Sequence, residues 1–127
     1  MQKSQTSMEF LFLIVIAFMV SLIFTAVSLE QQNEINFQKE YLLLKDLGLK
    51  IQGEILLAAN VEDGYSRKFN IPAKLENFDY DIIISNYTLL AVESKNHLFA
   101  VRIPSVNGTI IKGNNLITKN NGNIKIN

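Results

Sequence analysis

The chain has 127 residues, of which 48% are hydrophobic and 19% charged, and 12 lysine and arginine residues balance 12 aspartate and glutamate residues. This length allows one small domain or one domain with an appendage, and a net charge of zero lacks the basic excess of a nucleic-acid-binding protein. The absence of cysteine excludes disulfides and thiolate chemistry. A single histidine leaves little material for a metal site or a base-activated nucleophile. We therefore expect a protein that is not an enzyme and uses no metal or other cofactor.

An uncharged run of 18 residues, FLFLIVIAFMVSLIFTAV, occupies positions 10–27. As a helix it would extend about 27 Å, close to the hydrocarbon thickness of a bilayer. Only Ser21 and Thr25 are polar, so the run lacks the polar face of a helix on a soluble core. Lys3 precedes the run and Glu30 follows it, which favours a cytoplasmic N-terminus with the rest of the chain outside. The sequence therefore predicts a segment that resides in a membrane at some stage.

The helical pattern continues beyond the apolar run. Neither glycine nor proline occurs between Gln5 and Leu47, and Asn60, Asp63 and Gly64 supply stop signals. These features predict one helix over residues 5–59, roughly 80 Å long. Its distal half carries two apolar rows of coiled-coil type, Phe37, Tyr41, Leu44, Gly48, Ile51, Ile55 and Ala58 in one and Ile35, Leu42, Leu49 and Leu56 in the other. Gly48 and Gly53 also lie in this half, and each costs about 1 kcal/mol relative to alanine in a helix interior, which predicts a weak or kinked lower half.

The remaining residues alternate in the manner of short β-strands. Strands are expected at 67–71, 80–85, 89–93, 98–103, 109–112, 116–118 and 123–126, with a hairpin connection at 94–97 and turns at Gly113-Asn114 and Asn121-Gly122. So small a sheet has a thin core, and packing it on the apolar stripe of the helix supplies the second layer. We therefore predict an α+β fold, a long N-terminal helix packed by a small antiparallel β-sheet domain. In that arrangement Leu49→Asp should unfold the β domain.

The N-terminus carries a short motif. A polar leader with Lys3 and Ser4 is followed by Gln5, Ser7 and Glu9 in the pattern Gln-x-Ser-x-Glu, and then by the apolar run. This combination resembles the class III signal peptide of archaeal type IV pilin-like proteins. The resemblance implies that a prepilin-type peptidase cuts between Ser4 and Gln5. It also implies that the pilus assembly machinery transfers the chain from the membrane into a cell-surface filament of identical subunits.

The resemblance divides the chain into functional segments. Residues 1–4 are the leader peptide, 5–27 the transmembrane and filament-core helix, 28–60 its amphipathic continuation, and 61–127 an extracellular β domain. The elements ISN, VRIP and NG in the last segment look like the β domains of archaeal proteins that bear this signal. The resemblance implies that the chain is a glycoprotein with a role in adhesion. We expect no nucleic acid among its partners.

Glu9 places a carboxylate at the start of a membrane helix, which costs free energy unless the group finds a partner or water. After cleavage Gln5 would carry an α-ammonium group one helical turn away, or next to Glu9 of a neighbouring subunit. We expect this pairing to support assembly, with Phe10, Phe18 and Ile23 among the contact residues. The alternative is that Glu9 lies at the headgroup boundary or stabilises the helix N-terminus by its charge.

Two other functions remain open. The chain could be a single-pass membrane anchor that does not polymerise. It could also be a secreted soluble β-domain binding protein, because Ala26-Val27-Ser28 offers small residues to a secretory signal peptidase ahead of Leu29. In that case the apolar run would be removed.

Several polar positions in the β region are candidate sites. Asn86-Tyr87-Thr88 and Asn107-Gly108-Thr109 are sequons for N-glycosylation, and we expect Asn107 to be the more accessible because Asn-Gly favours an exposed turn. His97 is expected in a solvated turn. The acidic residues Glu76, Asp79 and Asp81 lack the spacing of an EF-hand calcium loop.

Overall fold

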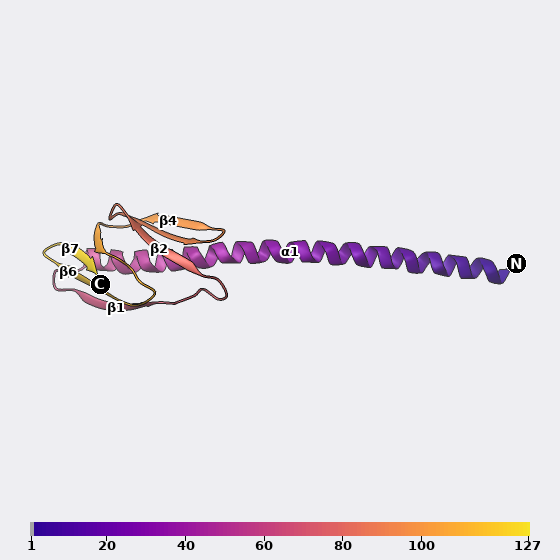
Figure 1. Ribbon diagram of the computed structural model, residues 1–127, viewed down its shortest axis with the longest axis horizontal. Helices are drawn as coiled ribbons and strands as arrows, with labels where there is room; N and C mark the ends of the chain where they lie inside the picture. Colours follow the sequence, from indigo (N-terminus) through magenta and orange to yellow (C-terminus); the bar gives the residue numbers. More distant parts are fainter. Residues whose placement is uncertain (1) are drawn as a thin grey trace. The chain divides into compact units, whose positions relative to one another are not determined.

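The computed structural model describes the backbone of residues 2–127 and the side chains of residues 7–127. One helix, α1 (Gln2–Asn60), precedes seven strands: β1 (Ser66–Ile71), β2 (Tyr80–Ser85), β3 (Leu89–Ser94), β4 (Leu98–Arg102), β5 (Val106–Gly108), β6 (Gly113–Asn120) and β7 (Asn123–Ile126). The fold is α+β, as the sequence predicted (Figure 1). Two compact units divide the chain within α1, Met1–Gln38 and Lys39–Asn127.

The first unit is helical throughout its described residues. Large apolar side chains between Met8 and Phe37 are exposed, and no glycine or proline interrupts the backbone hydrogen bonds. The helix continues without a break to Asn60, so Gly48 and Gly53 do not interrupt it. The predicted end at residue 59 is correct to within one residue.

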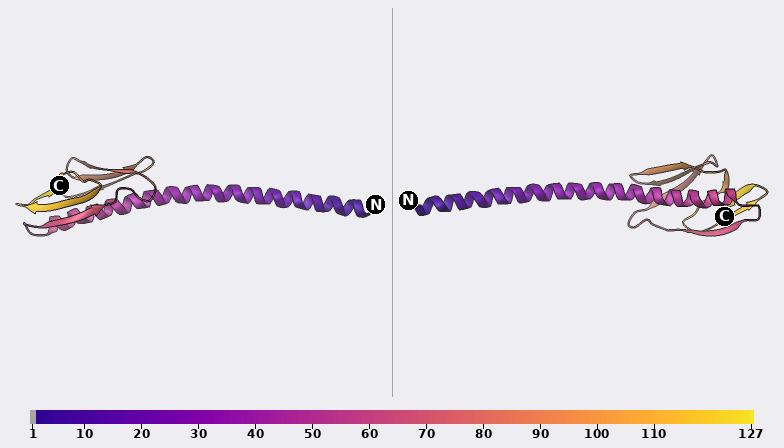
Figure 2. Two further views of the ribbon diagram at one scale, coloured as in Figure 1. Left: turned by 60° about the horizontal axis from the view of Figure 1, so that its bottom comes forward. Right: turned by 180° about the vertical axis from the view of Figure 1, so that it is seen from behind.

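The second unit contains two sheets. One has the strand order β1-β6-β7-β5 and the other the order β2-β3-β4. All neighbouring strands are antiparallel except β5 and β7, which are parallel. The expectation of a purely antiparallel sheet was therefore wrong for this one pair. Both views of Figure 2 show the strands beside the last turns of α1.

The helix contributes one of the two predicted rows to the core. Leu44, Gly48, Ile51, Ile55 and Ala58 are buried, joined by Leu47, and they pack with apolar residues of the strands, among them Ile71, Tyr80, Leu90, Val92, Val106, Ile117 and Ile126. The row is confirmed over these positions, and it provides the second layer that the thin sheets need. Tyr41 and Phe37 are exposed instead.

The second predicted row does not enter the core. Leu42, Leu49 and Leu56 keep 54%, 42% and 41% of their surface exposed, because they lie on the side of α1 away from the buried row. The expectation that Leu49→Asp unfolds the β domain was therefore wrong, since an aspartate at this position would reach water.

Polar contacts fix the strands to the helix. Lys119 Nζ donates hydrogen bonds to the carbonyl oxygens of Ala59 and Val61, each at 2.7 Å, and so satisfies groups at the end of α1. Gln52 Nε2 donates to the carbonyl oxygen of Arg102 at 2.8 Å. These directional hydrogen bonds fix the position of the strands along the helix, which apolar packing alone does not specify.

Further contacts are charged. Ser94 Oγ donates to Glu40 Oε1 at 2.7 Å, and Arg67 Nε lies 3.2 Å from Glu54 Oε2. Glu54 is more shielded than Arg67, with side-chain exposures of 13% and 50%, so this pair is screened less than a fully exposed one.

The strand and turn predictions were correct for β1 to β4, for β7 and for one turn, and they were wrong for one strand and one turn. Strands β1 to β4 lie within one residue of their expected ends, β7 matches residue for residue, and Asn121-Gly122 forms the expected turn with positive φ at both residues. Residues 109–112 are not a strand, and Gly113-Asn114 begins β6 rather than forming a turn. Asn114 accepts a hydrogen bond from Asn70 Nδ2 at 2.9 Å on the neighbouring β1, so cross-strand pairing replaces the local turn.

Tyr80 lies at the centre of the second unit. Its hydroxyl donates a hydrogen bond to the carbonyl oxygen of Pro72, and Lys112 Nζ lies 4.8 Å from the centre of its ring. Burial raises the pKa of the Tyr80 hydroxyl above its ordinary value, because the phenolate would lose its water.

Candidate functional site

The apolar part of α1 is the leading candidate for a functional site. The stretch Ser7–Asn60 contains an 18-residue window with the composition of a membrane span, and none of that window is buried within the chain. Phe10, Phe18 and Ile23 are exposed by 65% or 66% of their surface. Exposed apolar surface this extensive marks a site that a membrane or a protein covers. By length and composition, α1 therefore qualifies as a membrane-spanning helix.

Two hydroxyl groups in and directly after the apolar run are satisfied within the helix. Thr25 Oγ1 donates to the carbonyl oxygen of Ser21 at 2.8 Å, and Ser28 Oγ donates to the carbonyl oxygen of Phe24 at 2.9 Å. A hydroxyl bound to the carbonyl four residues earlier needs no water. The segment can therefore enter an apolar environment without leaving these donors unpaired.

Glu9 is placed on α1 with its side chain exposed, beside Met8, Phe12 and Leu13. The carboxylate thus stands among apolar side chains, as the sequence predicts. The side chains of Lys3, Ser4 and Gln5 lie outside those that the structure describes, and so does the predicted contact between Glu9 and the Gln5 ammonium. Ser7 is exposed on the same helix.

The two sequons occupy different structures. Asn86 lies in the β2–β3 turn with φ of 51°, followed by Tyr87 with φ of 60°, and Thr88 N donates to the carbonyl oxygen of Ser85 at 3.2 Å. Asn107 is exposed but lies in β5, paired in register with Lys125 of β7. The expected Asn-Gly turn at residue 107 was wrong. Asn86 and Asn107 are both exposed, so either asparagine can be reached at the surface.

The acidic residues near β2 each have a lysine partner. Glu76 Oε2 lies 2.8 Å from Lys39 Nζ, whereas the carboxylates of Asp79 and Asp81 are 3.7 Å and 3.8 Å from lysine nitrogens. Among residues 7–127 no group of three or more potential ligands converges on a point where a metal could bind. His97 lies between β3 and β4 with its ring 5.9 Å from that of Tyr41, and it is partly rather than fully solvated.

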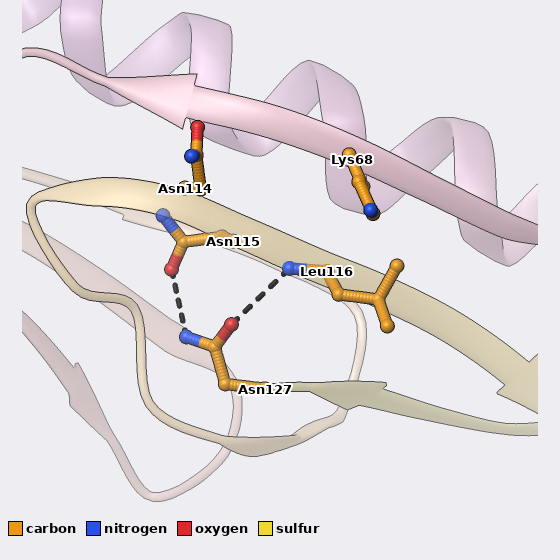
Figure 3. A pocket seen from close by; sticks show the side chains of 5 residues that line it. All are labelled: Lys68, Asn114, Asn115, Leu116 and Asn127. Carbon is orange, nitrogen blue, oxygen red and sulfur yellow. Dashed lines mark hydrogen bonds between the residues drawn. The ribbon is translucent and has the colours of Figure 1, made fainter.

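A polar hollow of about 250 Å³ lies beside β6, lined by Lys68, Asn114, Asn115, Leu116 and Asn127 (Figure 3). Its amides are already engaged with the chain. Asn127 Nδ2 donates to Asn115 Oδ1 at 2.8 Å, and Leu116 N donates to Asn127 Oδ1 at 3.1 Å. The buried Asn115 also bridges the backbone of Ile111 and Gly113. These amides therefore hold the chain together and do not form a ligand site.

No protein family, curated protein or solved structure matches this chain. The arrangement of one long apolar N-terminal helix with a small β domain on its distal part is consistent with a pilin-like architecture. The contacts of Asn115, Lys119 and Glu40 with distant residues were not predicted from the sequence. Only the charged or amide character of their side chains signalled a polar contact, and nothing in the local sequence specified the partner.

Proposed function

We propose that this protein is a structural subunit of a type IV pilus-like cell-surface filament. The observation that carries the proposal is the exposed apolar segment of α1, since covering it requires lipid before assembly and other copies of the chain afterwards. The Gln-x-Ser-x-Glu motif at Gln5, Ser7 and Glu9 supports the same function. In this proposal a prepilin-type peptidase removes residues 1–4, the N-terminus starts in the cytoplasm, and the β domain is displayed outside.

Glu9 supplies the electrostatic part of the assembly step. When apolar helices bundle, a carboxylate and an ammonium group lose water, and an unpaired charge is then far costlier than a paired one. Pairing of Glu9 with the α-ammonium of Gln5 would remove that cost and fix the axial position of the subunit. Phe10, Phe18 and Ile23 would supply apolar contact, and lysine at Phe18 or Ile23 would block insertion or bundling by adding an unpaired charge.

The test compares Glu9→Gln with Glu30→Gln, a matched change just beyond the apolar run. Processed protein in membranes and sheared filaments are measured by immunoblot and electron microscopy, and the mature N-terminus by mass spectrometry. We expect a mature chain that starts at Gln5, and fewer filaments for Glu9→Gln only. Wild-type filament yield with Glu9→Gln would remove the electrostatic role.

The same measurements separate the alternatives. A chain that starts at Leu29 would support the secreted β-domain protein. Processed protein confined to membranes, without filaments, would support the single-pass anchor that does not polymerise.

A further inference from the structure

The turn between β6 and β7 contains an asparagine followed by a glycine, a pair prone to spontaneous loss of the asparagine side-chain amide. Asn121 and Gly122 have φ of 50° and 76°, as in the tight hairpin turns that this pair favours. Both residues are exposed, so water reaches them. Glycine has no side chain to hinder the approach of its own nitrogen to the preceding residue. Burial therefore gives this turn no protection against the reaction.

The reaction is an attack within the main chain. The backbone nitrogen of Gly122 gives up its proton and attacks Cγ of the Asn121 side chain. A bond forms between this nitrogen and Cγ, the bond from Cγ to the side-chain nitrogen breaks, and ammonia leaves. Water then opens the resulting imide ring at either carbonyl group, which gives aspartate or isoaspartate. The first step therefore depends on the freedom of one atom, the Gly122 nitrogen.

Asp63 binds this same nitrogen. Gly122 N donates a hydrogen bond to Asp63 Oδ1 at 2.8 Å, across 59 positions of sequence. The hydrogen bond keeps the proton on the nitrogen and restrains the rotation of the peptide group that the attack requires. The negative charge of a carboxylate beside the nitrogen also disfavours the anionic form that attacks. Both effects oppose deamidation of Asn121.

The connection between α1 and β1 holds Asp63 beside the turn. Gly64 N donates to the carbonyl oxygen of Lys119, and Lys119 N donates to that of Tyr65, each at 2.9 Å. Lys119 Nζ donates to the carbonyl oxygen of Val61 at 2.7 Å. These hydrogen bonds lie on both sides of Asp63 in the sequence, so the position of its carboxylate is part of the fold.

We propose that Asn121-Gly122 is a deamidation site and that Asp63 is the residue that suppresses its reaction. Isoaspartate at position 121 would route the main chain through Cβ and add one atom to the turn. The pairing of β6 with β7 depends on the length of this turn, and it places Ile124 and Ile126 in the core. Asp63 thereby protects the packing of the β domain. This role concerns the second unit and does not depend on filament formation.

The test compares Asp63→Ala with Glu62→Ala, which removes the same charge from the exposed neighbouring residue. The purified full chain is kept in detergent micelles at neutral pH, and samples are digested with trypsin and analysed by mass spectrometry. Cleavage after Lys119 and Lys125 releases residues 120–125 as one peptide. We expect Asn121 to react several-fold faster in Asp63→Ala than in wild type or Glu62→Ala. An unchanged or slower reaction in Asp63→Ala would overturn the proposal.

The second Asn-Gly pair of the chain is an internal control. Asn107-Gly108 is exposed as well, but it lies in β5 and is paired with β7. If Asp63→Ala only loosened the fold, both asparagines would react faster. We expect the rate at Asn107 to stay at its wild-type value, and equal acceleration at the two sites would overturn the specific role of Asp63.

A third variant tests the hydrogen bond itself. Asp63→Asn keeps an oxygen that can accept the bond from Gly122 N, so we expect a smaller acceleration than for Asp63→Ala. Equal acceleration by the two variants would contradict the role of the hydrogen bond.

The consequence for the fold is measured on the aged Asp63→Ala protein. Chains that contain isoaspartate at position 121 should be cut by protease at lower urea concentration than unreacted chains of the same sample. Equal resistance of the two forms would overturn the protective role for β-domain packing.

Discussion

Gly48 allows the contact between α1 and β4, and replacing it tests how tightly the sheet packs on the helix. A Cβ built at Gly48 would lie 2.5 Å from Cδ1 and 2.6 Å from Cε1 of Phe99, so the aromatic ring must move. Gly53 lies one and a half turns later in the same helix, and a Cβ there meets nothing within 4 Å. Gly53→Ala is therefore the matched control for Gly48→Ala.

The expected magnitudes follow from two terms. Replacing glycine by alanine in a helix interior stabilises by about 0.8–1.0 kcal/mol at either position. Overpacking at a tight contact costs about 1–3 kcal/mol, and only Gly48→Ala incurs it. We expect Gly53→Ala to raise the free energy of unfolding by about 1 kcal/mol and Gly48→Ala to lower it by about 0–2 kcal/mol. Because the helix term is common to both variants, their difference isolates the collision with Phe99.

The assay is pulse proteolysis of the full chain in detergent micelles across a urea series, at a concentration where the chain is monomeric. A shift of the midpoint at constant slope reports stability alone. Phe99→Leu combined with Gly48→Ala should recover part of the loss, with a coupling energy of about 0.5–3 kcal/mol. Equal stability of Gly48→Ala and Gly53→Ala would refute the tight packing of Phe99 on the helix.

Three further changes test the second unit by the same proteolysis assay. Ile51→Asp should unfold this unit, since Ile51 is fully buried. Leu49→Asp should leave the free energy of unfolding of the monomer within about 0.5 kcal/mol of wild type. A comparable loss of stability from both variants would contradict the assigned helix face. Asn115→Leu should cost about 2 kcal/mol, because it removes the hydrogen bonds between the buried Asn115 side chain and backbone groups of Ile111 and Gly113, and a neutral result would show that these amide contacts contribute little. The Tyr80 hydroxyl binds its proton more strongly in the folded chain than in the unfolded chain, so its contribution to the free energy of unfolding is complete below pH 10.0 and declines as the pH rises above that value. Tyr80→Phe should lose part of this decline at alkaline pH, and an unchanged pH profile would contradict the raised pKa.

Local patterns were sufficient to predict the helix and most of the strands. Unbroken helical sequence up to Leu47 predicted α1, an isoleucine-rich run predicted β2, and the turn at Asn121-Gly122 marked the start of β7. The segment 109–120 was predicted poorly because asparagine and glycine favour turns locally. There Asn115 binds backbone groups of Ile111 and Gly113 and the side chain of Asn127. Gly113 and Asn114 also pair with Ile71 and Asn70 of β1, which lie 42 and 44 residues earlier in the sequence. Distant pairing therefore decides the conformation, and no local propensity contains that information.

The candidate site was predicted in outline by composition. The uncharged run at 10–27 predicted the exposed apolar helix, whereas the backbone conformation at the second sequon depended on the pairing of β5 with β7. Asn107 and Gly108 would favour a turn in isolation. Their register with Lys125 and Ile126 holds them in a strand instead, and Asn86 takes the exposed hairpin position.

The two apolar rows of α1 differ in a way that explains their different positions. Leu44, Gly48, Ile51, Ile55 and Ala58 alternate steps of four and three, which gives a band wide enough to cover a sheet. Leu42, Leu49 and Leu56 have only steps of seven, and Lys45 and Gln52 occupy the positions that would widen their row. A narrow row with charges at its edge cannot cover a sheet, but it suits contact with a single helix, because two helices touch along a seam. Both rows have the same heptad period, and the width of each apolar band distinguishes the row that packs on the chain's own strands from the row that stays exposed.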